Sequence, residues 1–512
     1  MTTFADLLAV AQTAYEQQAD SPPAERLRAA GLAVVLGSDD PRLLAGLITG
    51  PLVPVSLAVE PAQAAEWLAG VTVDDGRLAH HRARRRGLGA YYTPSWLVSR
   101  LADLVSPLHG SALDPACGAG AFLVELLRRG VTDLHGVDGD PLAVLAARRA
   151  LVAAGLGVDD AVARVRLGDG LLDPSLRGRF SLVIGNPPWG LAFDRGYRAR
   201  LADAGLLDAG EPSSEAAFLR AAHSQVAPGG RVAFVLPESW LSTRRGRSLR
   251  RWLLASTAVE RIEVYRKGVF ASARDMVPVL LVTQRAAPAS GTAVAWHGLS
   301  RPLTTDPTAL AERVVDPLAW RHEPDSVFAL GVDDGLRGAA RLDDLASLHD
   351  GFYKSHLRPS DDGEPMLTAA RQVRPFALDP LDSLARMAVD GLPSSELARQ
   401  RRPKLLVHAM RKPALAQRIV AAADPDGAYL ASNNLLMVIP RDDCPWSLAA
   451  LAALLNSGPV NRWYAARFIQ VNIEAFTLGA VPLPVWSAEA EAALLGASAD
   501  QLDSVVLALY GG

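Results

Sequence analysis

Residues 112–127 read ALDPACGAGAFLVELL and place a strand, a turn and a helix in immediate succession. The first three residues end a short apolar strand, and after Gly120 the apolar residues take the spacing of a helix. Gly118 and Gly120 let a ligand approach the backbone closely at this crossover. The unit predicts an α/β protein with a ligand site at the turn, although such a turn can also be purely structural.

An acidic residue follows at the spacing of a nucleoside site. Residues 134–138, LHGVD, form a second strand that ends on Asp138, about twenty residues after the glycine turn. A carboxylate in that position can hydrogen-bond a ribose diol. The third glycine of the dinucleotide-binding pattern is missing, which argues against a pyrophosphate over the turn. We therefore predict a nucleoside cofactor without phosphates, such as S-adenosylmethionine.

A third strand, residues 163–168, ends just before Asp169. Carboxylates at the carboxyl ends of strands line the crevice of an open α/β sheet, so Asp169 can accept a hydrogen bond from the adenine amino group of the cofactor. The structural alternative is an aspartate that caps a helix or closes a turn.

A fourth strand ends in a rigid loop within residues 181–190, SLVIGNPPWG. Pro187 and Pro188 forbid the strand to continue, so Asn186 lies at its mouth. The Asn186 oxygen and the Pro187 carbonyl can accept hydrogen bonds from an exocyclic amino group, while Trp189 stacks on the ring that carries it. Such bonds draw the nitrogen lone pair toward an electrophile. The structural alternative is a strand exit followed by a core tryptophan.

The remaining elements extend the same pattern. Thr93 and Pro94 mark the start of an amphipathic helix, which is either a simple cap or a site for an anionic group. A serine-capped helix at 213–222 precedes a buried strand at 231–237, and two more β-rich runs follow. Strands that alternate with helices in this way predict a mainly parallel sheet covered on both faces.

Composition limits the class of protein. The chain has 512 residues, which is too long for one ordinary core, and its net charge of −3 supplies no global attraction to nucleic acid or membranes. Its 2 cysteines, Cys117 and Cys444, form neither a disulfide framework nor a metal-ligand cluster. Neither a signal peptide nor a membrane-spanning run is evident. We expect a soluble, cytoplasmic protein without a metal.

Between residue 89 and about residue 285, the order of these motifs resembles the gamma-class DNA adenine-N6 methyltransferases, of which the TaqI enzyme is the type. The resemblance implies a Rossmann-like class I methyltransferase fold that uses S-adenosylmethionine. It implies a cofactor site formed by Tyr92, Thr93, Pro94, Asp114, Ala116, Gly118, Gly120, Asp138 and Asp169. It implies a catalytic site formed by Asn186, Pro187, Pro188, Trp189 and Phe270.

Two details of the resemblance bear on the substrate. Many relatives have Tyr or Phe where this chain has Trp189, and Glu where it has Asp138, and both changes keep the physical role. Phe270 falls where the family places a second aromatic ring that sandwiches the extruded base, and ordinary core packing is the alternative for this residue. Release-factor glutamine methyltransferases and some RNA methyltransferases carry a similar loop, so the loop alone does not specify DNA.

We expect four regions along the chain. Residues 1–85 form a helical N-terminal segment, 86–286 the catalytic domain, 287–340 a connector, and 341–512 an α+β domain similar to target-recognition domains. The predicted function is site-specific methylation of adenine N6 in duplex DNA, in restriction-modification or phage defence, with a restriction endonuclease as a possible partner. The alternatives are an RNA or protein-glutamine methyltransferase, or a catalytically silent DNA-binding specificity module.

Basic clusters are the expected contacts to DNA phosphates, with solvated surface as the alternative. The basic run at 80–86 is either a linker or a phosphate contact. The clusters that can line two walls of a duplex cleft contain Arg244, Arg245, Arg247, Arg250, Arg251, Arg399, Arg401, Arg402, Lys404, Arg411 and Lys412. Trp463, Tyr464 and Phe468 have helical spacing, which favours core packing over base contacts.

Overall fold

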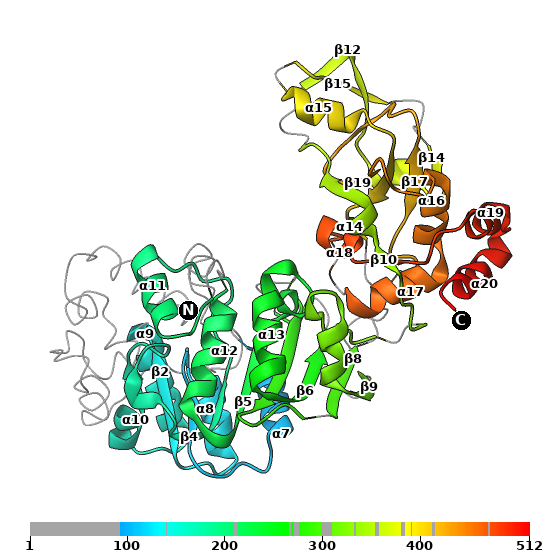
Figure 1. Ribbon diagram of the computed structural model, residues 1–512. Coiled ribbons are helices and arrows are strands. Elements are labelled where there is room, and N and C mark those ends of the chain that lie inside the picture. Colours follow the sequence, from blue (N-terminus) through cyan, green and yellow to red (C-terminus); the bar gives the residue numbers. More distant parts are fainter. Residues whose placement is uncertain are drawn as a thin grey trace. The chain divides into compact units, whose positions relative to one another are not determined.

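The computed structural model describes residues 93–511 apart from 140, 209–212, 266–267, 271–275, 290, 298–309, 332–333, 354–357, 380–383, 391, 412–414, 469 and 471 (Figure 1). The expected helical segment 1–85, the basic run at 80–86, Tyr92 and Lys412 lie outside the described residues. The chain divides into two compact units. Unit 1 is the described part of Met1–Trp240 and Ser248–Arg321, and unit 2 is that of Leu241–Arg247 and His322–Gly512.

Unit 1 is built on a 9-stranded sheet in the order β3-β2-β1-β4-β5-β7-β6-β8-β9. The strands are β1 Ala112–Asp114, β2 Leu134–Asp138, β3 Val165–Leu167, β4 Phe180–Gly185, β5 Val226–Pro237, β6 Ala258–Val264, β7 Pro278–Gln284, β8 Thr292–His297 and β9 Leu310–Val315. Strands β1 to β5 pair in parallel, and β7 is antiparallel to both β5 and β6. The predicted mainly parallel sheet is confirmed, and the carboxyl ends of β1 to β5 share one edge.

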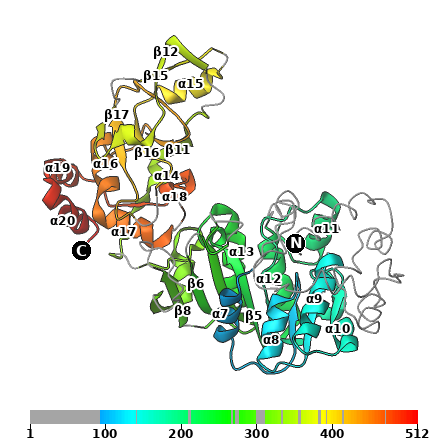
Figure 2. The ribbon, with the colours of Figure 1, turned by 180° about the vertical axis from the view of Figure 1, so that it is seen from behind.

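Helices cover both faces of this sheet. They are α7 Ser95–Leu104, α8 Ala121–Arg128, α9 Pro141–Ala153, α10 Val158–Arg164, α11 Arg195–Asp203, α12 Ser214–Gln225 and α13 Arg247–Ser256. Leu182 and Ile184 of β4 share a core with Leu97 of α7 and Phe122 of α8. Val183 lies between them and points to the other face, because side chains alternate along a strand, and α12 packs against β4 and β5. Figure 1 shows α12 in front of the sheet. Figure 2, which is the view from behind, shows α7, α8 and α9 on the opposite face.

The sheet extends beyond the region expected from the sequence. Strands β8 and β9 lie within residues 287–340, which we expected to be a connector. β8 pairs in parallel with β6, and β9 pairs with β8 in the antiparallel sense. β9 carries Glu312 and Arg313 in its middle, a composition typical of edge strands and not of buried ones. This polar composition explains why β9 resembles a connector in the sequence.

Unit 2 has the predicted α+β character. An antiparallel sheet has the order β11-β19-β16-β17, a second has the order β15-β12-β18, and the pairs β10–β20 and β13–β14 are short ribbons. The strands are β10 Ala340–Arg341, β11 Ala346–Asp350, β12 Arg358–Leu367, β13 Val373–Arg374, β14 Ala377–Leu378, β15 Ala385–Ala388, β16 Lys404–His408, β17 Ala421–Asp424, β18 Leu430–Ala431, β19 Leu435–Pro440 and β20 Pro482–Leu483.

The helices of unit 2 supply much of its core. They are α14 Leu342–Leu345, α15 Ser394–Gln400, α16 Leu448–Asn456, α17 Gly458–Arg467, α18 Ala475–Gly479, α19 Ala488–Gly496 and α20 Ala499–Leu509. Trp463, Tyr464 and Phe468 are buried in this core, which confirms the interpretation of their spacing. In the part of the chain that the structure describes, none of the helices combines the length and the apolar character needed to cross a membrane.

Candidate active site

The glycine turn after β1 leaves room above its backbone. Gly118 has a φ of 53° and Gly120 a φ of 84°, both in the left-handed region that favours glycine. A Cβ atom on Gly118 would have no heavy atom within 4 Å, whereas a Cβ on Gly120 would lie 3.0 Å from Ala147 of α9. The two glycines therefore differ in role: Gly118 faces open space in which a ligand can lie, and Gly120 lets α8 begin close to α9.

Two carboxylates flank this turn. Asp138, at the end of β2, accepts a hydrogen bond of 2.8 Å from the Gly118 N–H. Asp114, at the end of β1, is 1% exposed and accepts a bond of 3.1 Å from the Ala116 N–H. Burial raises the pKa of Asp114 to about 8, and the charge of Asp138 adds to the shift. A pKa of about 8 favours the protonated, neutral acid at pH 7.

The end of β4 lies against Asp114. A Cβ on Gly185 would be 2.6 Å from the Asp114 Oδ1, so only a glycine fits at this position. The next residue is Asn186, whose Nδ2 donates to the Thr93 Oγ1 over 2.9 Å. The amide nitrogen is thus directed to the start of α7, and the carboxamide oxygen lies on the other branch of the side chain. Thr93 and Asn186, which are 93 residues apart in sequence, are brought together at the carboxyl edge of the sheet.

The start of α12 holds the loop that follows Asn186. The Ser214 hydroxyl donates to the Pro188 carbonyl over 2.9 Å and accepts a bond of 3.1 Å from the Leu191 N–H. Glu215 accepts a bond of 2.9 Å from the Gly190 N–H. The sequence indicates Ser214 and Glu215 only as part of a helix start. Their contacts to the loop depend on the fold, so no local pattern could have revealed them.

Trp189 and Phe270 contact each other directly. Trp189 is buried, and its indole N–H donates to the Val235 carbonyl over 3.2 Å. The two rings meet edge to face, with centroids 5.2 Å apart and an interplanar angle of 87°. Both rings belong to the apolar core on the α7 side of the sheet. A base can enter between them only if they separate, so the predicted sandwich remains a prediction.

Asp169 closes the turn after β3. Its Oδ1 accepts hydrogen bonds from the N–H groups of Leu171 and Leu172, over 2.9 Å and 3.1 Å. The same oxygen accepts a bond of 2.9 Å from the hydroxyl of Tyr197 on α11. Asp169 therefore has the structural role in a turn that the sequence analysis gives as the alternative. It engages one carboxylate oxygen, which is compatible with a bond from a cofactor to the other oxygen.

A buried ion cluster fixes α7 to β6. Glu263 is 0% exposed and accepts bonds of 3.0 Å and 2.6 Å from the Arg100 guanidinium. Arg261 and the Tyr265 hydroxyl also donate to it, over 2.6 Å and 2.8 Å. Burial alone would raise the pKa of Glu263, but hydrogen bonds from Arg100 and Tyr265 lower it. The cluster holds the helix that follows Thr93.

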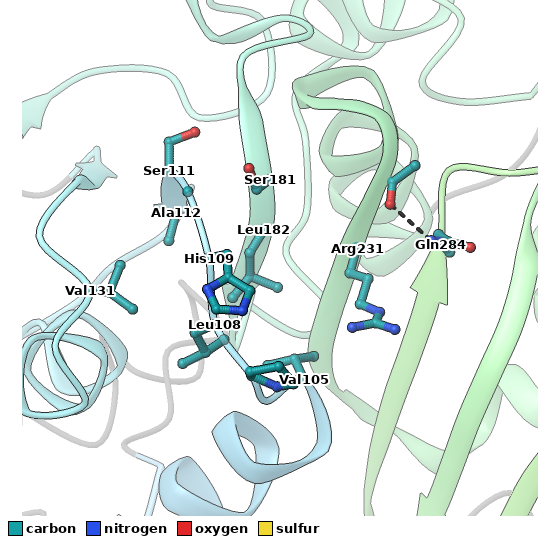
Figure 3. A pocket seen from close by; sticks show the side chains of 13 residues that line it. Val105, Leu108, His109, Ser111, Ala112, Val131, Ser181, Leu182, Arg231 and Gln284 are labelled. Carbon is teal, nitrogen blue, oxygen red and sulfur yellow. Dashed lines mark hydrogen bonds between the residues drawn. The ribbon is translucent and has the colours of Figure 1, made fainter.

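A cavity of about 270 Å³ lies at the opposite edge of the sheet (Figure 3). It is lined by residues at the amino ends of β1, β4 and β5, including Ala112 and Leu182. Two of its polar side chains have structural partners: Gln284 donates to the Gly229 carbonyl over 2.9 Å (Figure 3), and Arg231 forms an ion pair of 2.9 Å with Glu260. This cavity is therefore separate from the edge that gathers the predicted site residues.

Part of the expected phosphate-binding surface is interior. Lys404 is 0% exposed and forms an ion pair of 2.7 Å with Asp424. Arg250 is buried and donates to the Trp240 carbonyl over 2.7 Å. The prediction that these two residues face DNA is wrong, because burial assigns both to the core. Within the described residues, the exposed members of the predicted clusters include Arg244, Arg245, Arg251, Arg401 and Arg402.

Known proteins resemble the chain over these elements. Residues 77–296 match the family model for N-6 DNA Methylase. Over 197 residues the chain is 27% identical to the Type II methyltransferase M.VspI of Vibrio sp. (strain 343), which covers 37% of this chain and 47% of that protein. Over 170 residues it is 28% identical to the Type I restriction enzyme MjaIX methylase subunit of Methanocaldococcus jannaschii, covering 30% of each. The matched part thus spans about half or less of these relatives.

Solved structures share the fold over a longer range. The Type IIL restriction-modification enzyme MmeI, in complex with DNA, matches 100% of this chain and 89% of its own with a TM-score of 0.57 at 16% identity. The DrdV–DNA complex matches 96% of this chain and 66% of its own, with a TM-score of 0.52 at 14% identity. At these identities the likeness is one of fold. The part of this chain that matches the N-6 DNA Methylase family, residues 77–296, contains the carboxyl edge of the sheet described above.

Proposed function

We propose that this chain is a site-specific methyltransferase that transfers a methyl group to N6 of adenine in duplex DNA. The hydrogen bond between Asn186 and Thr93 is the observation that carries the proposal. It orients the amide at the mouth of β4, beside the buried Asp114 and on the same sheet edge as the open Gly118. In this proposal the edge would hold a methyl donor and, next to it, the acceptor for an amino group.

The residues at the turn fit S-adenosylmethionine, the cofactor that the family implies. When bound, this cofactor supplies an electrophilic methyl group on a sulfonium sulfur. Gly118 leaves space for it, and Asp138, which accepts a bond from the Gly118 N–H, would bind the ribose. Asp114 would pair with the ammonium group, since a cation relieves the energetic cost of its ionisation. Asp169 would accept a hydrogen bond from the amino group of the cofactor's adenine ring.

Other proposed cofactor contacts rest on the resemblance. Thr93 and Pro94 precede α7 and would form a wall of the site with Ala116, whose N–H already donates to Asp114. Tyr92 would extend this wall and lies outside the described residues.

Asn186 and Pro187 would prepare the substrate nitrogen. The target adenine swings out of the helix, and its two amino hydrogens are donated to the Asn186 oxygen and the Pro187 carbonyl. These bonds direct the nitrogen lone pair toward the methyl group, and positioning supplies much of the acceleration. Transfer would break the bond between the methyl carbon and sulfur and leave the cofactor as a neutral thioether. The alkylated nitrogen would then lose a proton to solvent, so no strong general base is required. Trp189 would stack on the base after it separates from Phe270.

The Asn186→Ala variant tests this role. Its methyl transfer to DNA should fall by about a hundredfold to a thousandfold, the scale of one lost hydrogen-bonding group in a transition state. Its affinity for S-adenosylmethionine should stay within about threefold of wild type, because Asn186 binds the base and not the cofactor. Equal losses of cofactor binding and transfer would contradict the assignment. Ser224→Ala, on the far end of α12, is a matched polar-to-alanine control and should leave both values unchanged.

The wider role follows from the same proposal. Unit 2 would recognise the target sequence, and the chain would act in restriction-modification or phage defence in the cytoplasm. A restriction endonuclease partner would share its recognition sequence. M.VspI and the MjaIX subunit are by name a methyltransferase and a restriction-enzyme methylase subunit, which supports this context.

A further inference from the structure

Phe376 combines two features that reduce stability. It is 54% exposed, so its ring gains little from burial. Its φ is 66°, a value that costs a residue with a side chain about 1 kcal/mol or more. It follows Pro375 in the two-residue turn between β13 and β14, the pattern of a type II turn, whose third position favours glycine. A large aromatic residue therefore occupies a place where glycine would be more stable.

The hairpin that presents Phe376 is firmly held. The Phe376 N–H donates to the Ala421 carbonyl over 3.0 Å, at the start of β17. Val373, at the base of the hairpin, is buried in a core cluster, and its carbonyl bonds to the His408 ring over 2.7 Å. The exposed Phe376 ring is thus carried by a hairpin whose base is fixed in the core.

Two exposed arginines precede the tip in the chain, and one of them is paired with an acid. Arg371 and Arg374 are exposed on either side of Val373, and Arg374 forms an ion pair of 2.6 Å with Asp379. Met410 is exposed just beyond β16, whose last residues pair with the first residues of β17. The chain therefore brings an exposed thioether to the same end of the β16–β17 pair as the aromatic tip.

We propose that Phe376 is a wedge that inserts between base pairs of the duplex substrate, with Arg371 and Arg374 on the flanking phosphates. The inference rests on the proposed function and adds to it the residue that deforms the DNA. Apolar side chains that enter a base step need a stiff support, exposure in the free protein and cations nearby to hold the backbone. The hairpin meets all three requirements.

The Phe376→Gly variant separates this role from a structural one. Removing the ring and the unfavourable φ should raise the thermal midpoint by a few degrees. The KM for plasmid DNA should rise about tenfold or more, and the affinity for random-sequence duplexes, measured by fluorescence anisotropy, should fall. The affinity for S-adenosylmethionine should not change. Phe376→Trp keeps a stacking ring and should restore most of the DNA affinity. Leu495 is another exposed apolar residue of unit 2, and the control variant Leu495→Ala should change neither the KM for DNA nor the affinity for duplexes.

Several outcomes would overturn the inference. A loss of stability in Phe376→Gly would show that the ring supports the fold. An unchanged KM and unchanged DNA affinity would show that it does not meet DNA. If the wild-type chain binds duplexes but does not methylate them, the proposed function fails, and the anisotropy comparison still decides the role of Phe376. If the wild type methylates DNA and the glycine variant does so equally well, only the wedge fails.

Discussion

Asp114 and Glu263 are both buried carboxylates of unit 1, and their surroundings are opposite. Glu263 accepts hydrogen bonds from two arginines and a tyrosine, and these bonds lower its pKa. Asp114 accepts a backbone N–H, and no cation of the described residues contributes to its pKa, which burial raises to about 8. An internally neutralised carboxylate holds a fold together. A buried carboxylate without such a partner, next to the glycine turn, is the one to which the proposed function assigns a cationic ligand.

Removing the internally paired carboxylate should produce the largest change. Glu263→Ala would leave Arg100 and Arg261 without their shared partner, and we expect a loss of about 3 to 5 kcal/mol in the free energy of unfolding. Urea denaturation followed by circular dichroism would measure it. Glu260→Ala, which breaks the more exposed pair with Arg231, is the control and should cost less than about 1 kcal/mol. Similar losses in the two variants would remove the distinction between the two carboxylates.

Asp114→Asn should have the opposite effect on stability. The neutral amide avoids the cost of a buried charge, so at pH 8 the variant should unfold at a higher temperature than wild type. Its affinity for S-adenosylmethionine should fall about a hundredfold, or about 2.7 kcal/mol, because the ammonium group loses its counter-charge. Calorimetry measures both quantities. A variant that is less stable and still binds the cofactor would place Asp114 among the structural carboxylates.

A change of pH should alter the affinity for S-adenosylmethionine slightly less than the Asp114→Asn substitution does. The pKa of Asp114 in the folded protein lies above its ordinary value of 3.8, so the free protein holds a proton on this group below about pH 8. That proton must leave before an ion pair with the cofactor forms. Affinity should therefore rise with pH, by up to about tenfold per unit between pH 6 and pH 8. The same rise in Asp114→Asn would assign the effect to another group.

The free energy of unfolding should depend on the same pKa, and the contribution of Asp114 to it should fall as the pH rises. Between pH 4 and pH 8 the unfolded chain releases the Asp114 proton and the folded chain keeps it, so rising pH favours the unfolded state through this group. The stability advantage of Asp114→Asn over wild type should therefore grow across this window and level off above pH 8.

Residues whose position depends on a short segment could be placed in the fold from the sequence. Gly118, Asp138 and Asn186 each stand at a strand end, and strand ends are recognisable from local apolar runs. The parallel sheet then brings these ends to one edge, as the fold confirms. The assignment of these residues to the cofactor and the base remains a prediction.

Contacts between distant segments could not be predicted in this way. Glu263 and Arg100 are separated by 163 residues, and the sequence shows no sign that they meet. Lys404 belongs to a basic run that suggests a surface, but the register of β16 and β17 places it opposite Asp424. Tyr197 bonds to Asp169 because α11 packs over the turn, which no local pattern encodes. Charge pairing across strands and helices therefore has to come from the structure.

The most direct test is to identify the methylated product. Purified chain is incubated with duplex plasmid DNA and methyl-labelled S-adenosylmethionine, and the DNA is then digested to nucleosides for mass spectrometry. The account predicts labelled N6-methyladenine with the wild-type chain and none with Asn186→Ala. Label on cytosine, label only on added RNA or protein, or no label with a wild-type chain that binds the cofactor would contradict it.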